Sequence, residues 1–268
     1  MEPVTLRLAA NSGVLVEGGG LRLLVDGVYG ENRYFTPPLK EVRKAVFGMD
    51  SLYRSLDYLL FTHRHVDHFS AVYADEYARN NESLRGLAVP APGEDPASFL
   101  EDRAPLPKAL ARGVLREVAP PEGGRCVLDL EEGCRVTYLR CGHLDGRTYG
   151  TVLHCAILLE LGRHRILFAG DADASLENRA LLADLGPLDA VLVTPLFYLH
   201  PEGRRILAAL GGVTVIDHLP FAEDDVTGLR PLAERVLRDY GRPGRDLALM
   251  EPGQTLLLDE ACSLINEQ

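Results

Sequence analysis

The sequence predicts an α/β protein in which two sheets pack face to face and helices cover their outer surfaces. Strand-like apolar runs alternate with helical patterns along the chain, and they do so in two similar halves. No low-complexity linker separates the halves, and 268 residues are enough to bury one large core. We therefore expect a single domain over residues 1–268.

The first half opens with three apolar or alternating runs, and Gly18-Gly19-Gly20 separates the last two as a hairpin turn would. Later segments repeat apolar residues at helical spacing, and prolines then break the pattern into short pieces over residues 86–119. We expect strands over 4–10, 13–17, 21–26 and 58–62, and helices over 39–47 and 67–79.

The second half repeats this alternation, with short turns that contain glycine between neighbouring strands. We expect helices over 175–185, 202–210 and 228–240, and strands over 125–130, 134–140, 152–161, 164–169, 189–193, 213–217, 246–250 and 255–258.

The composition is that of an ordinary globular protein, with 46% hydrophobic residues. No apolar run approaches the roughly 18 residues that cross a membrane, and the N-terminus shows no signal-peptide pattern. The five cysteines are odd in number and form no C-x-x-C pair, which indicates reduced thiols and a cytoplasmic location. The net charge of −11 disfavours binding to nucleic acid.

The most informative segment is Thr62-His63-Arg64-His65-Val66-Asp67-His68, which directly follows an apolar run. Imidazole and carboxylate groups are ligands that zinc and similar divalent metals prefer. Alternate side chains share a face in a segment that leaves a strand, so His63 and His65 can bind one ion together. Asp67 and His68 lie beyond the strand end and can face a second ion. The alternative is a polar loop that happens to be rich in histidine.

This motif resembles the H-x-H-x-D-H signature of the metallo-β-lactamase-fold hydrolases, and other family features follow in the same order. They are an isolated His143, the strand-end pair Gly170-Asp171, His218 after a short strand, and an early strand that closes on Asp26. The resemblance spans about residues 4 to 258. It implies a four-layer αββα sandwich of two mixed sheets, with a metal site where strand ends of both halves converge.

The resemblance assigns two divalent metal ions, zinc first, with manganese or iron as alternatives. Asp171 would bridge them, and Asp67 would also be catalytic, because it could orient the bridging hydroxide or receive its proton. Asp26 would orient a ligand histidine from behind. The ligand sets are His63, His65 and His143 for one ion, and Asp67, His68 and His218 for the other.

Each of these assignments has an alternative. His143 could be a plain turn residue, and Asp171 could cap the helix that follows it. His200 competes with His218, because it precedes Pro201 at a helix start and could cap that helix or face the substrate. His154 and His164 fall within predicted strands, and we expect ordinary sheet positions for them.

The segment over residues 28–56 is the expected specificity element, since it follows the strand that ends in Asp26. Arg33 could bind an anionic substrate and Tyr34, with neighbouring aromatic residues, could cover it, or these residues could only pack a surface loop. Tyr198 follows the predicted strand over 189–193 and could donate a hydrogen bond to a developing oxyanion.

Phe69-Ser70 follows the motif where glyoxalase II and antibiotic-hydrolysing enzymes usually have glycines, which is similar to ascorbate-6-phosphate lactonase-like proteins. We expect a binuclear hydrolase that uses a metal-bridging hydroxide on a small ester, lactone or phosphoester. The alternatives are a mononuclear iron enzyme like persulfide dioxygenase, a metal-dependent nuclease and a catalytically silent binding protein. A small molecule is the expected partner, and the oligomeric state stays open, with a homodimer as one option.

Overall fold

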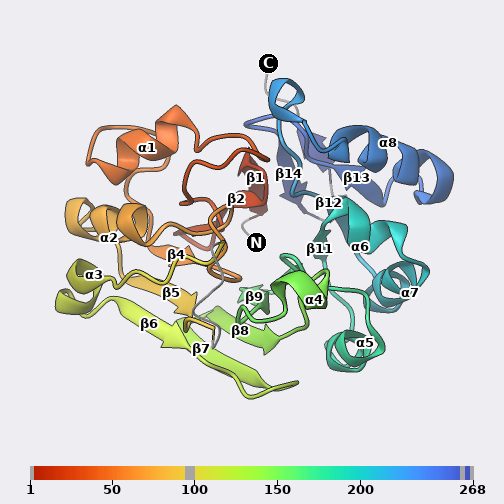
Figure 1. Cartoon of the computed structure of the whole chain (residues 1–268), viewed down its shortest axis with the longest axis horizontal. Coiled ribbons are helices and arrows are strands. Elements are labelled where there is room, and N and C mark those ends of the chain that lie inside the picture. The colour runs from red at the N-terminus through yellow and green to blue at the C-terminus, as the bar shows by residue number, and fades with distance from the viewer. Residues whose placement is uncertain (1–2, 94–99, 260–262, 266–268) are drawn as a thin grey trace.

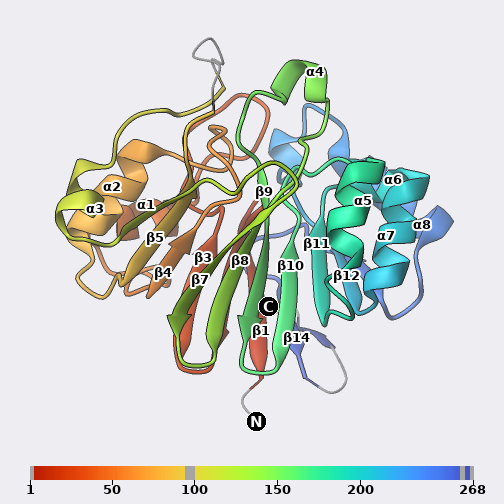
Figure 2. The same ribbon diagram turned by 90° about the horizontal axis from the view of Figure 1, so that it is seen from below.

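The computed structural model describes residues 3–93, 100–259 and 263–265, and the structural statements below concern these residues. Two mixed sheets lie face to face and helices cover both outer surfaces (Figure 1). Figure 2 shows α1, α2 and α3 on one side of the paired sheets and α5, α6, α7 and α8 on the other. The predicted αββα sandwich is confirmed.

The first sheet has eight strands, and its second half is parallel because helices return the chain between neighbouring strands. The order is β15 (Ser263–Ile265), β14 (Thr255–Leu258), β1 (Val4–Ala10), β2 (Gly13–Gly18), β3 (Leu21–Val25), β4 (Tyr58–Leu60), β5 (Gly86–Pro90) and β6 (Leu115–Val118).

The second sheet has seven strands, antiparallel from β7 to β10 and parallel from β10 to β13. The order is β13 (Asp246–Ala248), β12 (Val213–Ile216), β11 (Ala190–Val193), β10 (His164–Phe168), β9 (Cys155–Leu161), β8 (Cys134–Arg140) and β7 (Arg125–Glu131).

Helices line the outer faces, and α4 lies beyond the strand ends (Figure 2). Their bounds are α1 (Lys40–Val46), α2 (Ala71–Asn80), α3 (Pro107–Ala111), α4 (Gly146–Tyr149), α5 (Leu176–Ala183), α6 (Pro195–Leu199), α7 (Pro201–Leu210), η1 (Ala222–Asp224) and α8 (Leu229–Tyr240).

Three buried apolar clusters hold the layers together. One lies between the sheets and includes Leu6 and Ile157, one joins the first sheet to α1, α2 and α3, and one joins the second sheet to the later helices. Burial of apolar surface at about 25 cal/mol per Å² is the main stabilising contribution of such clusters. The parallel strands end at one edge, which is where side chains of both halves can meet.

Three predicted elements need correction. The strand over 255–258 pairs with β1 and belongs to the first sheet, although it follows the second half in the chain. The helix expected over 67–79 begins at Ala71, because Ser70 caps it and residues 66–68 form a turn. The strand expected from 152 begins at Cys155, so His154 lies in the loop before it.

Four cysteines are unpaired among the described residues, namely Cys126, Cys134, Cys141 and Cys155, while Cys262 lies outside them. Within the described part of the chain, no helix combines the length and apolar character that a membrane crossing requires.

Candidate metal centre

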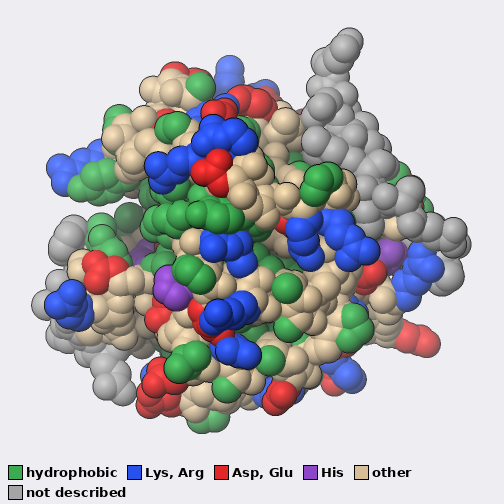
Figure 3. Space-filling model, turned by 90° about the vertical axis from the view of Figure 1, so that its right-hand side faces the viewer, with side chains coloured by type: hydrophobic (Ala, Val, Ile, Leu, Met, Phe, Trp, Pro, Cys, Tyr) green, Lys and Arg blue, Asp and Glu red, His purple; other side chains and the backbone are tan. Residues whose placement is uncertain are grey.

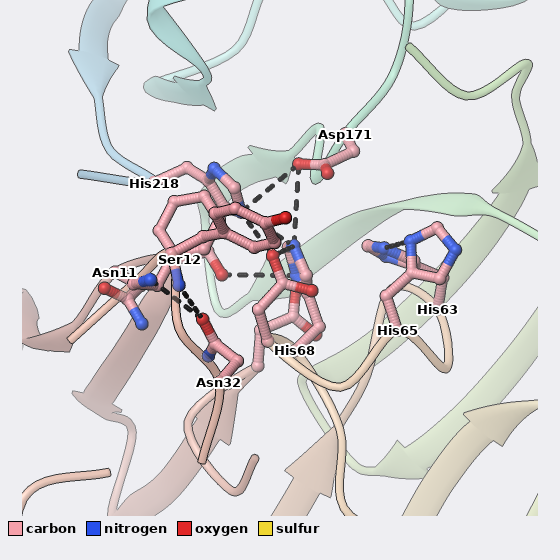
Figure 4. A network of polar contacts seen from close by, with 12 residues as sticks. Asn11, Ser12, Asn32, His63, His65, His68, Asp171 and His218 are labelled. Atoms are coloured by element: carbon pink, nitrogen blue, oxygen red, sulfur yellow. Dashed lines mark hydrogen bonds and ion pairs between the residues drawn. The ribbon is translucent and has the colours of Figure 1, made fainter. Parts of the chain in front are cut away.

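The structure brings the predicted histidines and aspartates together in one buried cluster at the strand ends (Figure 4). The cluster contains three groups of potential metal ligands. Within each group, the ligand atoms all lie within 4.8 Å of one another. The groups are His63, His65 and His143; Asp67, His68 and His218; and His63, His68 and Asp171.

The H-x-H-x-D-H segment folds into a tight turn directly after β4. The backbone amides of His68 and Phe69 both donate to the carbonyl oxygen of His65, at 2.9 and 2.8 Å. This turn reverses the chain, so that His68 returns beside His63, with ring centroids 4.1 Å apart. The backbone amide of Ala71, at the start of α2, donates to Asp102 Oδ2 at 2.7 Å.

His143 and Asp171 come from neighbouring loops that are tied to each other. The backbone of His143 forms an isolated bridge with Ala172, and the amide of Leu144 donates to the carbonyl oxygen of Asp171 at 2.7 Å. His218 follows β12 and has a φ of 58°, a left-handed conformation that is uncommon for a residue other than glycine. Such strained positions cluster at functional sites.

Asp171 lies between the two halves of the cluster. Its Oδ1 is 3.5 Å from His68 Nε2 and 3.6 Å from His218 Nε2, while its Oδ2 is 3.5 Å from His143 Nε2. The helix-cap alternative is wrong, because Ser175 caps α5 by accepting from the amide of Asn178.

Outer hydrogen bonds fix which nitrogen each histidine presents. His143 Nδ1 donates to the carbonyl oxygen of Leu144 at 2.6 Å, and His68 Nδ1 donates to Asp26 Oδ2 at 2.9 Å. Thr62 Oγ1 donates to Asp26 at 2.6 Å and accepts from His63 Nδ1 at 3.0 Å. All three rings therefore direct the lone pair of Nε2 into the cluster, which is the tautomer that a metal ligand needs.

Asp26 is the shared outer partner of two ligand-type histidines, one directly and one through Thr62. It is buried, and its φ of 47° is also left-handed. Its Oδ1 accepts from the backbone amide of Thr62 at 2.8 Å. This geometry matches the orienting role that we expected for Asp26.

The cluster contains buried polar atoms that have no hydrogen-bond partner among the described residues. They are His65 Nε2, His143 Nε2, His154 Nε2 and Asp171 Oδ1. Buried polar atoms are nearly always paired, so such a concentration indicates a missing partner. In addition, His68 Nε2 lies 3.0 Å from His218 Nε2, and both nitrogens face Asp171 Oδ1, at 3.5 and 3.6 Å. A divalent cation would satisfy the unpartnered atoms of His65, His143 and Asp171, which belong to the donor groups, and the residues present therefore fit a metal.

Burial and the neighbouring histidines hold the pKa of His63 well below its usual range. Burial, together with His143, lowers the pKa of His65 to about 4. Both rings are neutral at pH 7, as metal binding requires.

In the donor group of Asp67, His68 and His218, the pKa values of the histidines shift in the opposite direction. Burial opposes protonation of His68 and His218, but Asp171 and the other nearby carboxylates raise the pKa of both rings above the ordinary value. These histidines in turn lower the pKa of Asp67 and Asp171, although burial opposes this. The carboxylates are therefore ionised and can compensate the charge of a cation.

Several candidate substrate residues lie elsewhere or have other partners. His200 caps α7, where its Nδ1 accepts from the amide of Glu202 at 3.2 Å. Tyr198 is buried and its hydroxyl donates to Asp246 at 2.7 Å, so the expected oxyanion contact is wrong for this residue. Arg33 lies 4.6 Å from the centre of the Tyr34 ring and donates to its hydroxyl, so these two exposed side chains pair with each other.

Sequence reasoning missed His154 and Tyr149 at the centre, and it included Phe35 only among the aromatic residues of the segment over 28–56. His154 is buried, with its ring 5.1 Å from that of His63, and its Nδ1 lies 3.3 Å from the carbonyl oxygen of Cys141. His164 is a sheet residue as expected, whereas His154 is not. Phe35 contacts His218, and Tyr149 contacts His65.

Comparison with known proteins shows that several solved structures are similar to this fold. No protein-family model matches the chain, and no curated protein matches it. Igni18, a metallo hydrolase from the archaeon Ignicoccus hospitalis, is 16% identical with a TM-score of 0.62, over 96% of this chain and 99% of that chain. YhfI of Bacillus subtilis, a metallo-β-lactamase fold protein, is 17% identical with a TM-score of 0.58, over 96% and 100% of the two chains.

CmlA of Streptomyces venezuelae, a diiron β-hydroxylase, is 19% identical with a TM-score of 0.55, over 96% of this chain and 54% of that chain. These likenesses concern the fold, since all three identities are low. Together with the strand order and the cluster at the strand ends, they show that this chain has the metallo-β-lactamase fold.

Proposed function

We propose that this protein is a metal-dependent hydrolase that holds two divalent ions and acts on a small ester, lactone or phosphoester. The observation that carries the proposal is the position of Asp171. Its two oxygens face histidines of both donor groups, and its Oδ1 is one of the buried atoms that lack a partner. A carboxylate placed in this way offsets the repulsion between two cations.

Each ion would have its own donors. One would be held by His63, His65 and His143, the other by Asp67, His68 and His218, with Asp171 between them. Bound there, such ions would supply Lewis acidity and lower the pKa of a coordinated water. Zinc suits the imidazole-rich set, and manganese or iron suits the set that contains more carboxylate.

The protein's own residues would orient the ligand histidines and accept a proton. Asp67 is the most exposed carboxylate of the cluster, with 17% of its side chain accessible, and its Oδ2 lies 3.4 Å from His218 Nε2. It is therefore placed to accept the proton of an attacking water on its carboxylate. Asp26 and Thr62 would keep His63 and His68 in the ligand orientation during turnover.

The names of the structural relatives support this proposal and also define its main competitor. Igni18 is described as a metallo hydrolase, while CmlA is described as a diiron β-hydroxylase. The same fold therefore accommodates oxidative chemistry at iron, so the identity of the metal separates the two possibilities.

The test combines metal analysis with a substrate panel. Protein purified without added metal is measured for metal per chain, and then assayed on chromogenic esters, lactones, phosphomonoesters, phosphodiesters and β-lactams. We expect about two ions per chain and hydrolysis of at least one ester, lactone or phosphomonoester.

The matched variants are His65→Ala, which removes a donor, and His164→Ala, which removes a histidine of β10 outside the donor groups. His65→Ala should lose metal and activity, while His164→Ala should keep both. One iron per chain without hydrolysis would favour an oxygenase, and no bound metal would favour a silent scaffold.

A further inference from the structure

Two aromatic side chains flank the metal centre at its opposite halves. The ring of Phe35 lies 4.4 Å from that of His218, in an edge arrangement with an interplanar angle of 63°. The ring of Tyr149 lies 5.6 Å from that of His65 and 5.5 Å from that of His143. Both aromatic residues are only partly buried.

The segment that carries Phe35 is held in place by several hydrogen bonds. Asn32 Oδ1 accepts from the amides of Tyr34 and Phe35 at 3.0 and 2.8 Å. The carbonyl oxygen of Thr36 accepts from Asn11 Nδ2 at 3.1 Å and from the hydroxyl of Tyr29 at 3.0 Å. A ring that is fixed before a ligand arrives loses little entropy on binding.

The segment that carries Phe35 is also attached to the metal-ligand turn. The amide of Gly30 donates to the carbonyl oxygen of Val66 at 3.0 Å, one residue before Asp67. The hydroxyl of Thr36 accepts from the amide of Phe221 at 2.6 Å, which lies three residues beyond His218. The position of Phe35 relative to the cluster is therefore set from both halves of the molecule.

Tyr149 occupies the equivalent place at the other half. It ends α4, a single turn that projects beyond the strand ends and has no buried residue (Figure 2). Its amide donates to the carbonyl oxygen of Asp145 at 3.0 Å, which holds the turn together. The ring thus reaches the histidines from the loop that follows His143.

Lysine supplies no anion-binding group in the donor segments, and the exposed arginines next to the two rings along the chain are Arg33 near Phe35 and Arg147 near Tyr149. The chain has three lysines, at positions 40, 44 and 108, and none lies in the donor segments. Arg33, two residues before Phe35, already lies over the Tyr34 ring. Figure 3 shows a notch at one edge of the surface, with hydrophobic side chains along it and histidine beside them. Such a surface favours apolar and aromatic groups.

We infer that Phe35 and Tyr149 form the two walls of the substrate site, and that the substrate carries an aromatic or compact apolar group beside an ester or lactone bond. The inference rests on the proposed hydrolase function. It assigns specificity to contacts with the rings and leaves the donor residues their proposed role in metal binding.

Carboxylic acids that resemble the products of ester hydrolysis test the contacts with Phe35 and Tyr149 without turnover. Binding of phenylacetate and of acetate to the metal-loaded protein is measured by calorimetry for wild type, Phe35→Ala and Tyr149→Ala. Tyr34→Ala is the matched control, because Tyr34 is adjacent to Phe35, is 41% exposed and pairs with Arg33 instead of a cluster histidine. We expect phenylacetate to bind about 3- to 10-fold more weakly to each wall variant, while acetate binding stays unchanged.

Metal content is measured for every variant, since Phe35 also packs against His218. If Phe35→Ala loses metal, Phe35→Leu keeps apolar packing without the aromatic ring, and Tyr149→Phe should restore binding that Tyr149→Ala loses. Equal weakening of acetate and phenylacetate, or the same loss in Tyr34→Ala, would overturn the inference. So would a substrate panel in which phosphomonoesters exceed aryl esters.

Failure of the two proposals can be told apart. If the protein binds phenylacetate through Phe35 and Tyr149 but hydrolyses no substrate, the proposed hydrolase function is wrong and the proposed role of the two rings stands. If the protein hydrolyses esters with no dependence on these two rings, the hydrolase function stands and the proposed role of the rings is wrong.

Discussion

The backbone amide of His218 donates a hydrogen bond of 3.0 Å to the carbonyl oxygen of Asn11, and both residues have left-handed backbones, with φ of 58° and 54°. This bond ties the end of β12 in the second sheet to the loop between β1 and β2 in the first. The conformation of a candidate metal ligand therefore depends on a residue about 200 positions earlier in the chain.

We predict that Asn11→Ala is destabilised by about 1–3 kcal/mol, because alanine resists positive φ and because Thr36 loses the hydrogen bond from Asn11 Nδ2. Asn11→Gly removes only the side-chain bond and should lose less stability. Urea denaturation measures both variants, and equal losses would show that the backbone conformation contributes nothing.

Asp171→Asn tests the shared carboxylate. Asparagine keeps the size but removes the charge between the two donor groups, so we expect loss of the more weakly held ion and at least a 100-fold fall in turnover. Because Ser175 caps α5, helix stability should change little. Metal analysis decides the matter, and two tightly bound ions with full activity would remove Asp171 from the centre.

His218 and His200 are distinguished by their different surroundings. His218→Ala should lose most of one ion, since His218 Nε2 faces Asp67 and Asp171. His200→Ala should keep both ions and lose about 1 kcal/mol or less, as expected for a helix cap. Metal content and thermal denaturation of the two variants check this, and the reverse pattern would exchange the two roles.

Arg64, between two of the motif histidines, is 1% exposed and acts as a structural anchor. Its Nε donates to the carbonyl oxygen of Pro90 at 2.7 Å, and one terminal nitrogen donates to Glu117 at 2.8 Å. Arg64→Lys loses the planar fork and should cost about 2–4 kcal/mol, whereas Arg135→Lys, at an exposed ion pair, should cost under about 1 kcal/mol. Comparable losses in urea denaturation would contradict this role for Arg64.

The metal-free protein should lose stability as the pH falls from about 6.5 to 4. Below pH 6.5 the unfolded chain protonates its histidines, but burial keeps His63, His65 and His154 neutral in the folded state. With a pKa of about 4, His65 alone would account for about 2 kcal/mol at pH 5.

One buried carboxyl opposes this trend. Burial raises the pKa of Asp217 to about 7, so the folded state gains stability from that group as the pH falls, and it offsets a loss about the size of that from His65. His63 and His154 add to the loss, so the net stability still falls. His68 and His218 have raised pKa values, so their stabilising effect is already complete below pH 6.5 and is lost only as the pH rises through those values. Asp67 and Asp171 have lowered pKa values and lose their effect only at more acidic pH. Thermal denaturation after chelation should show a falling midpoint, and His65→Gln should reduce the slope. A constant midpoint between pH 6.5 and 4.5 would contradict the prediction.

The sequence by itself determined the features that depend on local geometry. Alternation of apolar residues indicated most strands of both sheets, and the spacing of His63, His65, Asp67 and His68 indicated a cluster at a strand end. These inferences succeed because side-chain direction in a strand is set by the backbone over two or three residues.

Only the tertiary structure decided which distant groups share the centre. β14 pairs with β1 across nearly the whole chain, and Phe35, Tyr149 and His154 reach the cluster from loops. Loop conformations depend on side-chain hydrogen bonds such as those of Asn32, and strand pairing over long separations depends on burial of the whole sheet. Neither loop conformation nor long-range strand pairing has a local pattern in the sequence. The positions of Phe35 and Tyr149 beside the cluster could therefore be found only in the folded chain.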